Sequence, residues 1–242
     1  MTKPLRDWSP RARARLAGLF EALEGALFTY GQVFVLDKLT VSGNAAATAA
    51  NLLAHESRLR LGFACCMVGI LCHIVWAYLF YDLFRIVSRR VSQLALCVML
   101  VGCAVQAVCT LLYLAPLLAL RGPGAVSAAA AGAESAPALA LALVGINELA
   151  FQIYLVFFGL WCFLSGWLII KSTFLPRILG WLLAIDGIGW MLYVDPPFAV
   201  SVFTLIAIAS AISELPLQLW LLIFGVNDQR WREQAAAAGP PS

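Results

Sequence analysis

The sequence predicts an all-α fold: a polytopic bundle of six transmembrane helices with both termini in the cytoplasm. Hydrophobic residues make up 62% of the chain and charged residues only 12%, whereas a globular domain has about one half and one quarter. Residues 149–170 carry no charge, and at about 1.5 Å rise per residue this run crosses a hydrocarbon core of about 30 Å. A transmembrane barrel would need short strands of alternating polarity, and these apolar runs are long and unalternated.

Charge and motif content exclude several functions. The net charge of +3 gives no argument for nucleic-acid binding. The seven cysteines all fall inside apolar runs without a CxxC pair, which favours packing between helices over a disulfide framework. Haem held by paired histidines is excluded because the chain has only two histidines, and a retinal Schiff base is excluded because no lysine lies at mid-membrane depth. No P-loop, HExxH or GxSxG motif occurs. No metal and no cofactor is therefore predicted.

The first span follows a basic cytoplasmic segment, residues 1–14, and opens a six-span domain over 15–226. It ends at Leu36. Because Glu21 and Glu24 interrupt its apolar run, we expect it to be retained and not removed as a signal peptide.

The connection and the next two spans are read from helix-start signals and apolar runs. Ser-Gly-Asn at 42–44 is a helix-start signal for an alanine-rich helix over 45–55 that we expect to lie along the interface. The second span then covers 61–84, and the third covers 91–120.

The C-terminal half is expected to contain the other three spans. A low-complexity loop over 121–137 precedes the fourth span, 139–170. Pro176 precedes the fifth span, 177–194, because proline lacks a backbone N–H and a helix can begin there without one. An Asp-Pro-Pro triplet leads into the sixth, 198–226. Residues 227–242 are expected to be a flexible cytoplasmic tail.

The basic residues predict the orientation. Six spans place both termini on one side of the membrane, and twelve of the sixteen lysines and arginines fall on that side. These twelve are Lys3, Arg6, Arg11, Arg13, Arg15, Arg85, Arg89, Arg90, Lys171, Arg177, Arg230 and Arg232. The other four are Lys38, Arg58, Arg60 and Arg121. Because short cytoplasmic loops are enriched in positive charge, the terminal side is predicted to be cytoplasmic.

Three segments carry a resemblance to a known family. They are VSGNAAATAANLLAHESRLRLGF (41–63), LVFFGLWCFLSGWLIIKSTFLPRILG (155–180) and SELPLQLWLLIFGV (213–226). Together they resemble the membrane protein family called domain of unknown function 4386, over residues 15–226. The resemblance implies a multi-span bacterial inner-membrane protein without an assigned activity, and it carries over no catalytic residue.

Ionisable residues inside the predicted spans are the candidate functional groups. They are Glu21, Glu24, His73, Asp82, Glu148, Asp186 and Glu214. A charge near the bilayer centre costs at least about 2.5–3.5 kcal/mol. Counted from the inner ends of the spans, Glu24 and Asp186 lie roughly 13 Å deep, and His73 and Glu214 roughly 18–20 Å. No lysine or arginine lies as deep, so we expect these acids to be shielded by one another, by amides, by water or by a cation.

Helical spacing groups further residues with these acids. Ser210, Glu214 and Gln218 share one face of the sixth span, with Pro216 beside them, and Gln106 belongs to a polar face of the third. The candidate cavity therefore contains Glu21, Glu24, His73, Gln106, Asp186, Glu214 and Gln218. Equally, such glutamines can be hydrogen-bonding contacts between helices, and His73 can be a satisfied interior histidine.

A separate groove of small residues, Gly159, Cys162 and Gly166, is expected to let another helix approach the fourth span closely.

Three functions remain open. The first is a transporter or permease-like protein with a proton- or cation-accessible acidic cavity. The second is an intramembrane, metal-assisted hydrolase using His73 and a carboxylate. The third is a non-catalytic membrane partner or structural subunit. The expected partners are the lipid bilayer and a small-molecule or cation ligand, with no nucleic acid and with oligomerisation left open.

Overall fold

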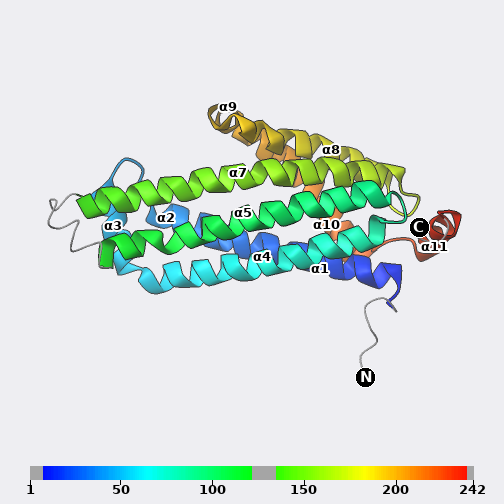
Figure 1. Ribbon diagram of the computed structural model, residues 1–242, viewed down its shortest axis with the longest axis horizontal. Helices are drawn as coiled ribbons and strands as arrows, with labels where there is room; N and C mark the ends of the chain where they lie inside the picture. Colours follow the sequence, from blue (N-terminus) through cyan, green and yellow to red (C-terminus); the bar gives the residue numbers. More distant parts are fainter. Residues whose placement is uncertain (1–7, 122–134, 239–242) are drawn as a thin grey trace, which may run out of the picture. The chain divides into compact units, whose positions relative to one another are not determined.

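The computed structural model describes residues 8–121 and 135–238, and it confirms the predicted all-α fold class with six helices that can span a membrane. The described residues are almost entirely helical and contain no strand. Six of their helices are long and apolar enough to cross a membrane (Figure 1). Lys3, Arg6, most of the predicted low-complexity loop and the last four residues lie outside the described part.

The helices follow the chain in the predicted order. They are α1 (Pro10–Thr29), the π-helical segment η2 (Tyr30–Leu36), α2 (Asp37–Leu39), α3 (Ala45–Ala54), α4 (Glu56–Phe84), α5 (Arg89–Arg121), α7 (Ser135–Lys171), α8 (Arg177–Met191), the 3₁₀ turn η3 (Leu192–Val194), α9 (Pro196–Ser201), α10 (Phe203–Ile223) and α11 (Asp228–Ala237). The chain divides into two compact units. Unit 1 comprises Met1–Ala22, Cys72–Cys103 and Ile153–Ser242, and unit 2 comprises Leu23–Leu71 and Ala104–Gln152.

In unit 1, the start of α1 and the C-terminal helix α11 lie at the same end (Figure 1). The backbone N–H of Arg11 donates to Oδ1 of Asp228 at 2.7 Å. Arg13, which is buried, forms an ion pair with Asp82 near the end of α4, and its guanidinium lies 5.0 Å from the ring centre of Trp231. These contacts bring the N-terminal helix, the end of α4 and α11 together.

The turn between α7 and α8 joins the same end. The amide of Thr173 in this turn donates to Oε1 of Gln234 at 2.9 Å, and the Trp231 indole N–H donates to the carbonyl oxygen of Leu83 at 3.0 Å. The start of α1, the end of α4, the turn between α7 and α8, and α11 thus lie together at one end of unit 1.

Glycines determine how closely α7 and α8 pack. A methyl group on Gly159 would lie 2.6 Å from the carbonyl oxygen of Gly187, and one on Gly166 would lie 2.6 Å from that of Gly180. Such distances leave no room for a side chain. The small-residue groove of α7 is therefore filled by α8 of the same chain.

Unit 2 contains buried hydrogen bonds between distant segments and an exposed group of ion pairs at the start of α4. The Tyr113 hydroxyl donates to the carbonyl oxygen of Gly31 at 2.6 Å, and the Asn147 amide donates to that of Cys109 at 2.5 Å. Glu56 forms ion pairs with Arg60 and Arg121. Asn44 caps α3 by accepting a hydrogen bond from the amide of Ala47, as its sequence signal predicts.

The first and second spans differ from the expectation. The first ends in the π-helical segment η2, and the Gly31 carbonyl in that segment accepts the Tyr113 bond, a long-range contact that the sequence does not reveal. The second span begins at Glu56, five residues before the expected start, where Glu56 can pair with its two arginines.

Two further expectations are corrected near the C-terminus. The sixth span is broken at Val202 into α9 and α10. At this break the Ser201 hydroxyl donates to the carbonyl oxygen of Phe198 at 2.7 Å, and this bond competes with the backbone hydrogen bonds of the helix. The tail, expected to be without regular structure, contains α11. Asn227 caps this helix by accepting from the Arg230 amide at 3.0 Å.

Candidate functional site

Three side chains that can bind a cation lie together in unit 1. They are Cys162 of α7, Asp186 of α8 and Glu214 of α10, and one ligand atom from each lies within 4.8 Å of the other two. We call these residues the acid–thiol cluster. It unites two of the predicted candidate acids with a cysteine that the sequence places in the packing groove.

Close helix packing positions the cluster. Cys162 lies between Gly159 and Gly166 along the face of α7 that meets α8, and a methyl group on Gly187 would lie 3.1 Å from the Cys162 Cβ. Asp186 directly precedes Gly187 on α8, so it lies at the same level along the helix pair as Cys162. Because glycines remove the side chains that would separate the two backbones, the thiol and the carboxylate can approach each other.

Glu214 is oriented by two hydrogen bonds to the same carboxylate oxygen. The Ser210 hydroxyl donates to its Oε1 at 2.7 Å from one turn earlier on α10, and the Trp190 indole N–H donates to it at 3.2 Å from α8. Trp190 lies one turn after Asp186 on the same helix. The two acids are thus presented to each other by α8 and α10.

Burial distinguishes the three members of the cluster. Cys162 and Asp186 have no exposed surface, whereas Glu214 is half-buried. Glu214, Ser213 and Trp190 lie near enough to interact with the Asp186 carboxylate. Even so, neither of its oxygens has a hydrogen-bond partner of normal geometry in the described part of the chain. A fully buried carboxylate without such partners is costly, so Asp186 needs an explanation beyond helix packing.

Glu21 of α1 belongs to the same unit and lies near enough to the Cys162 thiol to interact with it. It is almost completely buried, with 7% of its surface exposed. A third carboxylate therefore lies in the surroundings of the acid–thiol cluster.

His73 of α4 lies in an aromatic group. Its ring centre is 4.9 Å from that of Trp76, and Tyr154 and Phe158 meet it edge-on at 6.1 and 6.2 Å. The Tyr154 hydroxyl lies 3.5 Å from Nδ1. The imidazole is thus enclosed by aromatic side chains of α4 and α7, while the acid–thiol cluster is built from other residues.

The other predicted residues are distributed over both units. Glu24 and Gln106 belong to unit 2, where Glu24 is half-buried and Gln106 is completely buried. Gln218 of α10, one turn after Glu214, is half-buried in unit 1. Asp82 is paired with Arg13 and Arg85, and Glu148 is exposed.

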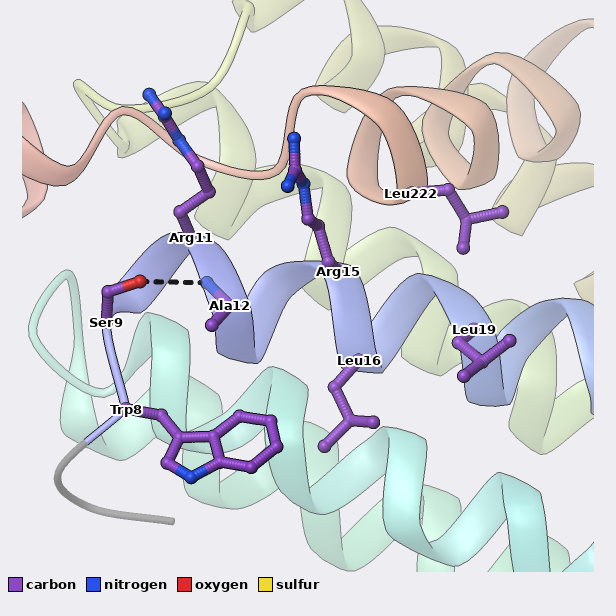
Figure 2. A pocket seen from close by; sticks show the side chains of 8 residues that line it. All are labelled: Trp8, Ser9, Arg11, Ala12, Arg15, Leu16, Leu19 and Leu222. Atoms are coloured by element: carbon purple, nitrogen blue, oxygen red, sulfur yellow. Dashed lines mark hydrogen bonds between the residues drawn. The ribbon is translucent and has the colours of Figure 1, made fainter. Parts of the chain in front are cut away.

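A surface hollow of about 430 Å³ lies beside the start of α1 (Figure 2). Arg11 and Arg15 extend from α1 toward the segment that follows α10, and Arg15 donates to the carbonyl oxygen of Ile223 at 2.6 Å. Its other lining residues are Trp8, Ser9, Ala12, Leu16, Leu19 and Leu222. A rim of two arginines over leucine and tryptophan side chains is the composition of a membrane–water boundary.

The sequence did not reveal that Cys162 belongs to the acid–thiol cluster, because a cysteine between two glycines at helical spacing is typical of a packing residue. A partial signal is that Asp186 precedes Gly187, which places it at the same level along α8 as a glycine that packs on α7. Residues 24 and 28 positions apart in the chain form no motif.

Six helices long and apolar enough to cross a membrane, with a buried thiol, a buried carboxylate and a half-buried carboxylate on three of them, define a polytopic helical membrane protein with a polar interior site. The model of the family described as Domain of unknown function (DUF4386) matches residues 16–225, and the chain belongs to this family. The resemblance noted from the sequence is thereby confirmed. Searches of curated proteins and of solved structures found no match.

Proposed function

We propose that this chain is a permease-like membrane protein that binds a cation at Asp186 and Glu214 and passes it across the bilayer. The observation that supports this function is the pair of carboxylates from α8 and α10, one of them completely buried, within 4.8 Å of each other and of a thiol. Acids at such depth are expensive in a membrane protein and commonly belong to ion pathways.

The structure of α10 also fits this function. Only 22% of the most apolar stretch of α10 is buried inside the protein, the smallest share among the six spans. Pro216 lies within the helix and Val202 breaks its start, so α10 has interrupted backbone hydrogen bonding on both sides of Glu214. Helices interrupted beside a polar site are a recurrent feature of transporters.

Neither alternative is favoured by a comparable observation. A hydrolase built on His73 would place this histidine with the carboxylates, and His73 instead packs against Trp76, Tyr154 and Phe158. A partner subunit would offer the α7 groove to another chain, and α8 fills that groove.

Purified protein in liposomes tests the proposal. Proton, Na⁺, Mn²⁺ and Zn²⁺ fluxes are measured with internal indicators for the wild type, Asp186→Asn and Glu214→Gln. At least one of these fluxes should exceed that of protein-free liposomes and fall about tenfold or more in both variants. Glu148→Gln, which neutralises an exposed acid of unit 2, is the matched control and should retain the flux. Equal flux with and without protein, or unchanged flux in both site variants, overturns the proposal.

The proposed location is a bacterial inner membrane, with both termini in the cytoplasm. Twelve of the sixteen basic residues fall on the terminal side, and the arginine-rimmed hollow at α1 suits contact with anionic phospholipid headgroups at that surface. Fusions of the C-terminus to green fluorescent protein and to an export-dependent phosphatase test the orientation. Fluorescence without phosphatase activity is expected, and the reverse pattern overturns it.

A further inference from the structure

The donor atoms of the acid–thiol cluster discriminate among cations. Na⁺, Mg²⁺ and Ca²⁺ prefer oxygen ligands alone, whereas a cysteine sulfur selects softer transition metals. We propose that the cation of this site is a thiophilic divalent metal of the Zn²⁺ class, bound by Cys162, Asp186 and Glu214. This inference rests on the proposed function for the role of the ion and adds its chemical class.

The geometry suits such an ion. Ligands of one tetrahedral Zn²⁺, at about 2.3 Å for sulfur and 2.0–2.2 Å for oxygen, lie about 3.3–3.8 Å apart. The three donor atoms lie within 4.8 Å of one another without an ion, so side-chain rotations that close each gap by roughly 1 Å complete the site. Three protein ligands leave a fourth position for water, as in sites that exchange their ligand, whereas closed structural sites use four.

Asp186 provides a second and independent indication of a ligand. It has no exposed surface, and neither carboxylate oxygen has a hydrogen-bond partner of normal geometry in residues 8–121 and 135–238. A bound metal would give these oxygens a partner at normal bonding distance, which the described side chains do not. Helix packing alone would be served equally well by an apolar side chain of this size.

The surroundings of Glu214 complete the argument. Ser210 and Trp190 both donate to its Oε1, which fixes the carboxylate as outer-shell partners fix metal ligands. Glu214 is also the one member of the cluster with exposed surface, since Cys162 and Asp186 have none. Of the three proposed ligands, Glu214 is therefore the one nearest the surface of unit 1.

Equilibrium binding of Co²⁺ and Zn²⁺ to the full-length protein in detergent tests the inference. Co²⁺ bound by a thiolate gives an intense charge-transfer absorption that oxygen ligands alone do not give. The wild type should bind one ion with this band. Cys162→Ser should lose the band, and its affinity should fall at least about tenfold. Asp186→Asn should show a similar loss of affinity. Cys97→Ser, which removes an exposed cysteine of α5, is the matched control and should keep both properties.

Three results would overturn the inference. They are the absence of saturable binding in the wild type, a Co²⁺ spectrum without the thiolate band, and a band that survives Cys162→Ser. Trp190→Phe, which keeps an aromatic ring but removes a donor to Glu214, should weaken binding while leaving the band, and this separates a binding effect from misfolding. Failure here together with Asp186-dependent proton or Na⁺ flux would reject the metal class alone. Failure of all fluxes with intact Co²⁺ binding would reject only the transport.

Discussion

Gly159 of α7 and Gly187 of α8 face each other so closely that neither position can carry a side chain. A methyl group on Gly159 would lie 2.6 Å from the Gly187 carbonyl oxygen, and one on Gly187 would lie 2.5 Å from that of Gly159. Both obstacles are backbone atoms, so only separation of the helices can relieve the clash. This contact lies next to Cys162 and Asp186, and the acid–thiol cluster depends on it.

Gly187→Ala should therefore destabilise unit 1 and weaken the site. We expect a loss of about 1–3 kcal/mol in unfolding free energy, as for other overpacked interiors, together with weaker Co²⁺ binding. Thermal unfolding in detergent measures the first effect and titration the second. Gly145→Ala is the matched control, because a methyl group there has no neighbour within 4 Å and alanine favours the helix. Equal stability of the two variants would contradict the packing argument.

Asp186→Asn should stabilise the metal-free protein while impairing its function. The substitution removes a buried carboxylate that has no hydrogen-bond partner of normal geometry in the described residues, and it adds an amide that can donate to Glu214. We expect a gain of about 1 kcal/mol, which is typical when a costly functional group is removed. The measurement is the unfolding temperature in the presence of a chelator. A lower temperature than that of the wild type would mean that Asp186 is a structural residue.

Asp82→Asn should destabilise the arginine-rich end of unit 1. Arg13 and Asp82 form an ion pair with side-chain exposures of 7% and 18%, so the substitution leaves a buried guanidinium without its counter-charge. The expected cost is about 3 kcal/mol, the lower end of the range for breaking buried pairs. Arg60→Gln breaks a pair in which Arg60 is 61% exposed and should have little effect. Similar losses in the two variants would contradict the assignment.

Tyr113→Phe should destabilise unit 2 by about 1–3 kcal/mol, because it removes the donor to the buried Gly31 carbonyl of the π-helical segment. The Tyr113 hydroxyl also packs against Gly62, where it takes the position that a side chain would occupy. Chemical denaturation monitored by tryptophan fluorescence gives the difference. Tyr78→Phe, which alters a tyrosine that is 53% exposed, should leave stability unchanged. An unaffected Tyr113→Phe variant would show that the contact contributes nothing.

Composition and apolar length fixed the number and order of the membrane helices, because a span has to satisfy its backbone internally and bury about twenty apolar residues in lipid. The helix starts at Asn44 and Pro176 were also predictable, since both rely on local capping chemistry. The π-helical segment was not predictable from local sequence, because its carbonyl partner, Tyr113, lies 82 residues further along the chain. The helix α11 was missed for a related reason: Asn227 gave a local signal, but Trp231 and Gln234 dock on distant segments.

What the sequence determined by itself was that this is a six-span membrane protein carrying acids at depths where charges are expensive. Only the tertiary structure decided that Asp186 and Glu214 meet, that Cys162 joins them, and that His73 lies among aromatic rings. The physical reason is that depth follows from position along a helix, whereas proximity across helices depends on rotation and separation. Here Gly159, Gly166, Gly180 and Gly187 set that separation by leaving nothing between two backbones.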